Sequence, residues 1–334
     1  MFDNKTILIT GGTGSFGKKF VSTLLEKYNP SKLIIYSRDE LKQFEMQNSD
    51  TFSRLNNENK MRYFIGDVRD YKRLKMAMED VDFVVHAAAL KQVPTAEYNP
   101  FEAVKTNIIG GQNVIEAALE NNVEKVIALS TDKAAAPINL YGATKLTSDK
   151  LFVAANNYTG FRNIKFSVVR YGNVMGSRGS VVPFFMKHKD NGFLPITDDR
   201  MTRFNITLEE GVDFVINCFK NMWGGELFIP KIPSYRILDV AKAIAPDAEI
   251  KIVGIRPGEK IHEEMITETD ALNCAEFEKY FVILPAVELW DKSKFLIESS
   301  DNEGKLCNSN FSYNSGNNTS FLSVEEIKDL IERI

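Results

Sequence analysis

Residues 5–17, KTILITGGTGSFG, decide the fold of this chain. The first six form a short apolar run typical of a buried parallel strand, and the stretch that follows, SFGKKFVSTLLEKY, has helical periodicity. Between them the glycines are spaced G-x-x-G-x-x-G, and Gly12, Gly14 and Gly17 also fit the ordinary spacing of a dinucleotide-binding turn. Such glycines let the backbone approach a pyrophosphate at the positive N-terminus of a helix. We therefore expect a nucleotide to bind at Gly11, Thr13, Gly14, Ser15, Phe16 and Gly17.

The alternation of strand and helix continues beyond this turn. Strand-like runs lie at 32–37, 61–67, 81–89, 125–131 and 165–173, and helical stretches lie at 101–121 and 140–158. Alternation of this kind predicts βαβ units, and so an α/β fold with a Rossmann-type doubly wound parallel sheet.

The pattern changes after Asn173. Short strands at 225–230 and 249–254 alternate with helices from 208 and over 235–245, which indicates a smaller mixed α/β substrate lobe. We expect a nucleotide-binding domain over 1–173, a substrate lobe over 174–286 whose strands can interleave with the main sheet, and a polar extension over 287–334. Within the extension we expect a mobile segment at 307–321 and a terminal helix capped by Ser323 and Glu326.

Composition excludes several classes of protein. The chain has 334 residues, 44% of them hydrophobic and 26% charged, and its net charge of −4 argues against a nucleic-acid binder. The cysteines and histidines are too scattered for a metal site. A strand beginning a few residues after Met1 leaves no signal peptide, and no apolar run approaches the roughly 20 residues that span a bilayer. We expect a cytoplasmic protein with no metal; its cysteines are Cys218, Cys274 and Cys307, and its histidines are His86, His188 and His262.

The end of the second predicted strand indicates which nicotinamide cofactor binds. An NAD enzyme usually carries an acidic residue there to hold the ribose 2′-hydroxyl, whereas this chain has Ser37 and Arg38. A guanidinium pairs with a 2′-phosphate through charge-assisted hydrogen bonds, so we expect NADP. The alternative is that Arg38 is a solvent-exposed side chain without a ligand.

Residues after the next strands complete the expected cofactor site. Asp67 and Val68 follow the third strand at the expected adenine edge. The alanines after the fourth strand leave room beside a cofactor, although small residues there also suit sheet packing. The remaining expected cofactor contacts are Ala87, Ala88, Ala89, Lys91, Asn107, Tyr141 and Lys145.

The segment STDKAAAPINLYGATK, residues 130–145, carries the expected chemistry. Tyr141 and Lys145 are four residues apart and therefore share one face of a predicted helix. Because an ammonium stabilises a nearby phenolate, we expect Lys145 to lower the pKa of Tyr141 from near 10. Tyr141 would then act as a base, removing a hydroxyl proton while hydride leaves the same carbon.

Together, TGGTGSFG, YGATK and RYGNV resemble the extended short-chain dehydrogenase/reductases. Within that superfamily the pair Asp132-Lys133, followed by LYGATK, resembles the inverting UDP-N-acetylglucosamine 4,6-dehydratases, which begin pseudaminic acid synthesis. GDVRD, RYGNVMGSRGSVVPFF, PITDDRMTRF and IRPGEKIHE are similar to the same family, so the resemblance spans about residues 5–285. It implies a lyase that uses NADP, acts on UDP-N-acetylglucosamine or a close UDP-sugar, and forms homodimers or hexamers.

The resemblance also implies catalytic roles. Oxidation of C-4 of the sugar makes the C-5 proton acidic, and Lys133 would remove it. We expect burial and repulsion from Lys145 to lower the pKa of Lys133. Asp132 would protonate the departing C-6 hydroxyl, with Thr131 in the same catalytic set. Hydride would then return to C-6, with C-5 inverted.

Substrate contacts are expected from the second lobe. Arginines match the phosphates of a uridine diphosphate, although each alone is more often a solvated loop charge. The expected set is Lys91, Asn173, Arg178, Thr197, Arg203, Arg256 and Glu259.

Other functions stay open at this stage. A UDP-hexose 4-epimerase or 4-keto reductase shares the fold and the Tyr-Lys pair but has no need of Asp132-Lys133. A retaining 4,6-dehydratase is nearer; retaining enzymes, which are often tethered to a membrane, and some inverting relatives carry Met where this chain has Tyr141, so we favour the inverting type. A non-catalytic NADP-binding regulator usually lacks the Tyr or the Lys. Departures from the family pattern leave the sugar and the stereochemistry open; they are Gln92, Ala136 and Asn205.

Overall fold

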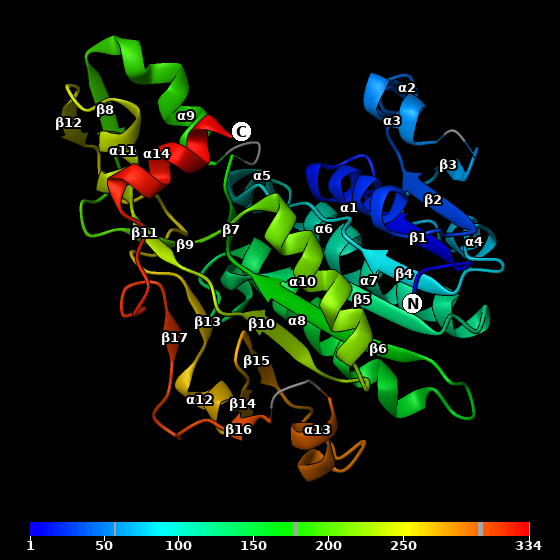
Figure 1. Ribbon diagram of the computed structural model, residues 1–334. Coiled ribbons are helices and arrows are strands. Elements are labelled where there is room, and N and C mark those ends of the chain that lie inside the picture. Colours follow the sequence, from blue (N-terminus) through cyan, green and yellow to red (C-terminus); the bar gives the residue numbers. More distant parts are fainter. Residues whose placement is uncertain (57, 177–179, 300–302, 334) are drawn as a thin grey trace.

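A computed structural model describes residues 1–56, 58–176, 180–299 and 303–333 (Figure 1). Its main sheet has the strand order β16-β14-β15-β10-β6-β5-β4-β1-β2-β3. The seven strands from β3 to β10 in this order run parallel, and the further pairs β10–β15, β15–β14 and β14–β16 are each antiparallel. The parallel strands are β1 (Thr6–Thr10), β2 (Lys32–Ser37), β3 (Met61–Ile65), β4 (Phe83–His86), β5 (Lys125–Thr131), β6 (Lys165–Tyr171) and β10 (Leu227–Pro230). The predicted doubly wound parallel sheet is confirmed.

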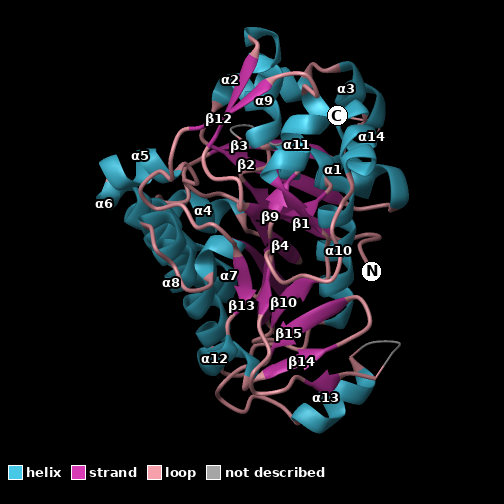
Figure 2. Cartoon of the chain, turned by 90° about the vertical axis from the view of Figure 1, so that its left-hand side faces the viewer, coloured by secondary structure: helices cyan, strands magenta, loops and turns pink. Residues whose placement is uncertain are grey.

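Helices cover both faces of this sheet. Figure 2 shows α7 and α8 on one face and α1 and α10 on the other. The helices of the first half are α1 (Ser15–Lys27), α2 (Glu40–Gln47), α3 (Asp50–Leu55), α4 (Tyr71–Ala77), α5 (Val93–Tyr98), α6 (Pro100–Ala103), α7 (Gly110–Glu120) and α8 (Leu140–Ala155). Short helical turns are η1 (Val104–Ile109), η2 (Asp132–Ala134) and η3 (Asn156–Tyr158). The predicted helix over 101–121 is therefore interrupted, because η1 has π-helical hydrogen bonding.

Strand order reverses between β1 and β4, which is the switch point where open α/β sheets bind ligands beyond the carboxyl ends of their strands. The glycine turn after β1 and the alanines after β4 lie at that point. The strand sequences are buried almost throughout because both faces are covered, so they consist of apolar runs rather than alternating ones.

Residues after 173 form the second lobe and also extend the main sheet. In the small sheets β9 pairs with both β11 and β7, β12 pairs with β8, and β13 pairs with β17. A second core, separate from the one beneath the main sheet, includes Phe185, Leu194 and Val240 and is joined by Ile327 of the last helix. The strands here are β7 (Asn173–Val174), β8 (Phe193–Ile196), β9 (Thr202–Ile206), β11 (Ser234–Arg236), β12 (Glu249–Ile252), β13 (Glu264–Ile266), β14 (Cys274–Glu276) and β15 (Tyr280–Ile283). The helical elements are α9 (Val181–His188), η4 (Lys189–Asn191), α10 (Leu208–Asn221), α11 (Ile237–Ile244) and α12 (Glu268–Ala271).

The C-terminal extension differs from its prediction. It contains α13 (Lys292–Glu298), β16 (Lys305–Leu306), β17 (Tyr313–Asn314) and α14 (Val324–Glu332). The expected mobile segment over 307–321 is wrong, because Tyr313 is buried against Phe281 and its hydroxyl donates to the carbonyl of Ile232 at 2.8 Å. Asn318 also donates to the carbonyl of Ile232 at 2.9 Å, and the Ser315 amide donates to that of Glu263 at 2.8 Å. The predicted capping box of Ser323 and Glu326 on α14 is confirmed.

The part of the chain that the structure describes contains no helix that is both long and apolar enough to cross a membrane. It also holds no cluster of His, Cys, Asp and Glu suited to a metal ion. All three cysteines are free thiols.

Candidate active site

The predicted catalytic pair lies in the short turn η2, directly after β5. Asp132 is 1% exposed, and its Oδ1 accepts from the Thr131 hydroxyl at 2.9 Å and from Lys133 Nζ at 3.0 Å. Its Oδ2 is buried without a hydrogen-bond partner among the described residues. Burial outweighs the favourable contacts and raises the pKa of the Asp132 carboxyl. The turn thus holds a buried carboxylate, paired with Lys133, whose affinity for a proton is increased.

Helix α8 carries Tyr141 and Lys145 against this turn. Asn139 caps the helix by accepting from the Gly142 amide at 2.8 Å. Gly142 is required there, because a Cβ at this position would lie 2.1 Å from the carbonyl oxygen of Lys133. The missing side chain lets the helix start directly against η2, which brings Tyr141 beside the catalytic pair.

The expected lowering of the pKa of Tyr141 by Lys145 is wrong. Burial raises the pKa of Tyr141 to about 12, and the neighbouring charge that opposes this rise is Lys133. Burial also lowers the pKa of Lys145, which favours its neutral form. The helical spacing predicted the shared face correctly, whereas the depth at which that face lies was not visible in the sequence.

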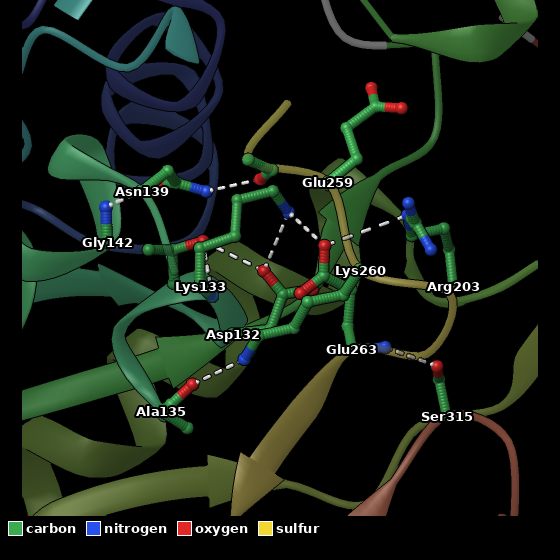
Figure 3. A network of polar contacts seen from close by, with 12 residues as sticks. Asp132, Lys133, Ala135, Asn139, Gly142, Arg203, Glu259, Lys260, Glu263 and Ser315 are labelled. Carbon is green, nitrogen blue, oxygen red and sulfur yellow. Dashed lines mark hydrogen bonds and ion pairs between the residues drawn. The ribbon is translucent and has the colours of Figure 1, made fainter. Parts of the chain in front are cut away.

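The expected lowering of the pKa of Lys133 is also wrong. Although burial favours the neutral amine, Asp132 and Glu263 outweigh it and raise the pKa of Lys133. Lys133 Nζ lies 3.2 Å from Glu263 Oε1 as well as 3.0 Å from Asp132 Oδ1 (Figure 3). Two carboxylates thus hold the lysine as a cation.

A loop from the second lobe closes over the turn. Asn139 donates from Nδ2 to the carbonyl of Gly258 at 2.8 Å, and Lys260 donates from Nζ to that of Ala135 at 2.8 Å (Figure 3). The next residue, Ala136, has a φ of +43°, in the left-handed region that side chains disfavour. The RPGEK segment is thus tied to the catalytic turn.

The glycine turn fits a dinucleotide. Gly11 has a φ of +67°, and a Cβ on Gly17 would lie 2.5 Å from the backbone of Gly12. Gly14 is the N-cap of α1 without a side-chain cap, and the first turn of the helix has no acidic residue. The helix N-terminus therefore has amides and positive potential available for a phosphate. The intervening Thr13 is buried, Ser15 is exposed, and Phe16 stacks on Phe20.

Arg38 lies at the end of β2 with a side chain 58% exposed. Its Nη1 is 3.7 Å from Asp67 Oδ2, and Asp67 also pairs with Arg69 at 2.7 Å. Although burial opposes it, these arginines hold the pKa of the Asp67 carboxyl below its usual range. Ser37 is buried and accepts from Gln43 Nε2 at 3.1 Å. Arg38 thus follows a buried, hydrogen-bonded strand end and extends toward solvent.

The predicted residues after β4 form one hydrogen-bonded unit. The amides of Ala87 and Ala88 donate to the hydroxyl of Thr10 at 3.2 and 3.3 Å, which joins this loop to β1. Asn107 accepts from the Leu90 amide at 2.8 Å and donates to Thr144 of α8 at 3.0 Å. It belongs to the π-helical turn η1, a feature common near functional sites. Ala89 lies in the same loop, Val68 is buried, and burial lowers the pKa of Lys91.

The predicted substrate residues lie in different settings. Asn173 is on β7 beside Asn205 of β9, and the side-chain oxygen of each is buried without a partner in the described chain. Arg203 points at Glu263, with its Nε 3.7 Å from Oε1 (Figure 3). Arg256 is 71% exposed and pairs with Glu259 at 2.5 Å. Thr197 follows β8 and is half-buried, and Arg178 lies outside the described residues.

Glu263 was missed by the sequence analysis. It ends the quoted motif IRPGEKIHE, yet nothing in the sequence indicates that it meets Lys133, 130 residues earlier in the chain.

Comparison with known proteins agrees with this geometry. The family model "Polysaccharide biosynthesis protein" matches residues 7–285. The chain belongs to this family. It is 60% identical over 334 residues to a UDP-N-acetylglucosamine 4,6-dehydratase (inverting) of Campylobacter jejuni, covering 99% of this chain and 98% of that protein. It is 41% identical to a UDP-glucose 4-epimerase of Rickettsia felis, covering 99% and 96%. The X-ray structure of Pen from Bacillus thuringiensis superposes with a TM-score of 0.87 at 38% identity, covering 100% of this chain and 98% of that one.

Proposed function

We propose that this family member is an inverting UDP-N-acetylglucosamine 4,6-dehydratase. The observation that supports this most is the Asp132–Lys133 ion pair beside Tyr141, because loss of water requires an acid and a base next to the residue that takes the hydroxyl proton. The near-full-length similarity to a protein of that name supports the same reaction. The expected product is the 4-keto-6-deoxy sugar nucleotide with inverted C-5, as in the first step of pseudaminic acid-type synthesis.

NADP is the proposed cofactor. The glycine turn and uncapped helix N-terminus suit a pyrophosphate, and Arg38 suits a 2′-phosphate. Bound NADP supplies reversible hydride exchange: one hydride is taken from C-4 of the sugar and one is returned at C-6. Tyr141 would take the proton of the C-4 hydroxyl, and the charge of the neighbouring Lys133 favours the phenolate electrostatically. The remaining contacts proposed for the cofactor are those predicted from the sequence.

The proton chemistry that we propose begins with the proton held by Lys133. Moving it from Nζ to Asp132 Oδ1, across 3.0 Å, breaks one N–H bond, forms one O–H bond and leaves a neutral amine beside a carboxylic acid. The amine of Lys133 then removes the C-5 proton, and the acid of Asp132 protonates the C-6 hydroxyl as it leaves as water. Afterwards Lys133 is again a cation and Asp132 a carboxylate, so the elimination restores the resting pair. A solvent proton then adds to C-5 from the opposite face as hydride adds to C-6, which inverts C-5, and Tyr141 returns the proton of the C-4 hydroxyl to solvent.

The UDP-sugar would bind between the two lobes. The proposed contacts include buried polar atoms that have no hydrogen-bond partner in the described chain, such as the side-chain oxygen of Asn173, and exposed cations such as Arg256. Arg203 is already engaged by Glu263, so its proposed role toward a phosphate competes with an ion pair. Lys91, Thr197, Glu259 and Arg178 complete the proposal. The domain division at 173/174 and 286/287, the homo-oligomer and the cytoplasmic location also stay predictions.

A UDP-hexose 4-epimerase is the alternative, because a relative of that name is 41% identical to this chain. Epimerisation at C-4 removes no water and leaves C-5 untouched, so it gives no use to an acid–base pair such as Asp132–Lys133. The two functions therefore predict different products.

Proton NMR of the purified protein with UDP-N-acetylglucosamine in deuterated water, without added nicotinamide cofactor, distinguishes them. We expect a new C-6 methyl signal, deuterium at C-5 and couplings of an arabino configuration. Formation of UDP-N-acetylgalactosamine without a methyl group would show an epimerase and would refute the roles of Asp132 and Lys133.

A further inference from the structure

Glu263 is buried against the catalytic pair although it comes from a distant part of the chain. It directly precedes β13, its side chain is 4% exposed, and its Oε1 lies 3.2 Å from Lys133 Nζ and 3.7 Å from Arg203 Nε (Figure 3). Its Oε2 is buried with no hydrogen-bond partner among the described residues. A carboxylate is costly to bury, so its position depends on the two cations.

The C-terminal extension fixes the backbone of Glu263. The Glu263 amide donates to Ser315 Oγ at 2.9 Å, and the Ser315 amide donates to the Glu263 carbonyl at 2.8 Å. Ser315 is fully buried and its hydroxyl also contacts Thr202 Oγ1 at 2.8 Å, next to Arg203 on β9. Antiparallel pairing of β13 with β17 continues this clamp. Ser315 thus holds together the two segments that carry Glu263 and Arg203.

We infer that Glu263 is a positioning residue for Lys133, and that the C-terminal extension holds it in place through Ser315. This inference rests on the proposed function, in which Lys133 exchanges a proton with Asp132. The ammonium of Lys133 lies between two carboxylates, those of Asp132 and Glu263. In this inference Asp132 receives the proton of Lys133, and Glu263 fixes the position of Nζ. Without Glu263, the ammonium would have Asp132 as its acidic neighbour and Arg203 as a repelling one.

The sign of the electrostatic effect follows from the groups around the pair. The negative charge of Glu263 raises the pKa of both Asp132 and Lys133. Its own pKa is held low by Lys133 and Arg203, which outweigh burial. The ionisable groups that face the cluster are Asp132, Tyr141, Arg203, Tyr235, Lys260 and Glu263. Replacing Glu263 by a neutral residue therefore lowers both pKa values of the pair.

The test compares Glu263→Gln with Glu264→Gln, an isosteric change at the neighbouring glutamate. The pH dependence of UDP-N-acetylglucosamine turnover is measured for each. Because the Asp132–Lys133 pair must hold one proton, turnover falls at low pH and at high pH, which gives the pH profile two flanks. Glu263→Gln is expected to move both flanks to lower pH by about one unit or more. Glu264→Gln and the charge-conserving Glu263→Asp are expected to keep the wild-type flanks. A slower Glu263→Gln enzyme with unmoved flanks would overturn the inference, since that is the result of a merely structural role.

A second readout does not need catalysis. Trace acetylation with acetic anhydride at fixed pH, followed by peptide mass spectrometry, reports the neutral fraction of Lys133. Glu263→Gln is expected to raise labelling of Lys133 severalfold relative to Lys150, an exposed lysine on α8. Unchanged labelling of Lys133 in Glu263→Gln would contradict the inference about Glu263. Absence of sugar dehydration by the wild-type protein would instead refute only the proposed function.

The role of the extension is tested by Ser315→Ala against Ser309→Ala, an exposed serine of the same extension. Ser315→Ala is expected to increase labelling of Lys133 in the same direction as Glu263→Gln but less, whereas Ser309→Ala leaves it unchanged. If circular dichroism shows that Glu263→Gln does not fold, the labelling of Lys133 in Ser315→Ala and Ser309→Ala still tests whether Glu263 positions Lys133. If Ser315→Ala shows the same labelling of Lys133 and the same pH profile as the wild type, the inference that the extension holds Glu263 in place is overturned.

Discussion

Lys133 Nζ lies 3.0 Å from Oδ1 of Asp132, its neighbour in the chain, and the two side chains meet in a three-residue turn after β5. Adjacent residues seldom pair, because in strands and helices their side chains diverge. The 3-10 turn, capped by the Thr131 hydroxyl, brings them together, and Gly142 of α8 packs against the Lys133 carbonyl in this turn. The acid–base pair is thus a product of local backbone geometry.

Replacing Lys133 by Met should separate oxidation from elimination. Removal of a general base typically costs roughly 10²–10⁴-fold in rate, so dehydration should fall by about that factor. At the C-4 hydride step Lys133 exchanges no proton and acts only through its charge on Tyr141, so reduced nicotinamide should still accumulate and be visible by absorbance. Lys150→Met on the exposed face of α8 serves as the control. Loss of both the reduced nicotinamide and the product would contradict the assigned role.

Arg38→Ala should weaken NADP binding selectively. Loss of a charge-assisted pair to the 2′-phosphate costs about 1.5–3 kcal/mol, or roughly tenfold to a hundredfold in Kd, while NAD should bind nearly as before. Isothermal titration calorimetry with both cofactors measures this difference. Lys42→Ala, on the next helix, should change neither affinity. An equal loss for NAD and NADP would show that Arg38 does not read the 2′ position.

Gly142→Ala should destabilise the junction between η2 and α8. The added Cβ would lie 2.1 Å from the Lys133 carbonyl, and relief of such overpacking typically costs about 1–3 kcal/mol. Gly211→Ala in α10 is the matched control, because its Cβ would meet Ile206 only at 3.9 Å and alanine favours a helix by about 1 kcal/mol. Chemical denaturation should therefore show opposite changes in unfolding free energy. Equal stability of both variants would contradict the close approach.

His86 should make the protein less stable in mild acid. Burial lowers its pKa in the folded chain from 6.5 to about 3, so below pH 6.5 the unfolded chain binds a proton that the folded chain excludes. Stability from this residue is complete above pH 6.5 and falls by up to about 1.4 kcal/mol per unit as the pH drops toward 3. Denaturation of wild type and His86→Gln between pH 7 and 4.5 isolates the effect. Parallel stability curves for the two proteins would refute it.

Much of the fold could be predicted because local patterns determine it. The run KTILIT and the glycines after it specify a strand, a turn and a helix within 23 residues, and the structure has β1 and α1 there. Tyr141 and Lys145 share a helix face as their spacing required. These features depend on neighbours in the chain.

What the sequence concealed depends on distant contacts and burial. Glu263 approaches Lys133 only because β13 is clamped by Ser315 from the extension, and no spacing links these residues. The pKa of Lys133 was therefore predicted with the wrong sign, since the second carboxylate was unknown. Tyr313 lies in a segment rich in Ser and Asn whose polarity indicated mobility, yet one aromatic side chain buried against Phe281 anchors it.

Transfer of hydride within one sugar tests the central claim most directly. UDP-N-acetylglucosamine carrying deuterium at C-4 would be incubated with the protein in ordinary water, without added nicotinamide, and the product examined by NMR and mass spectrometry. A 4-keto sugar whose C-6 methyl group is CH2D is predicted, because the hydride taken from C-4 returns at C-6. A product that keeps deuterium at C-4, or a methyl group free of deuterium, would contradict the account.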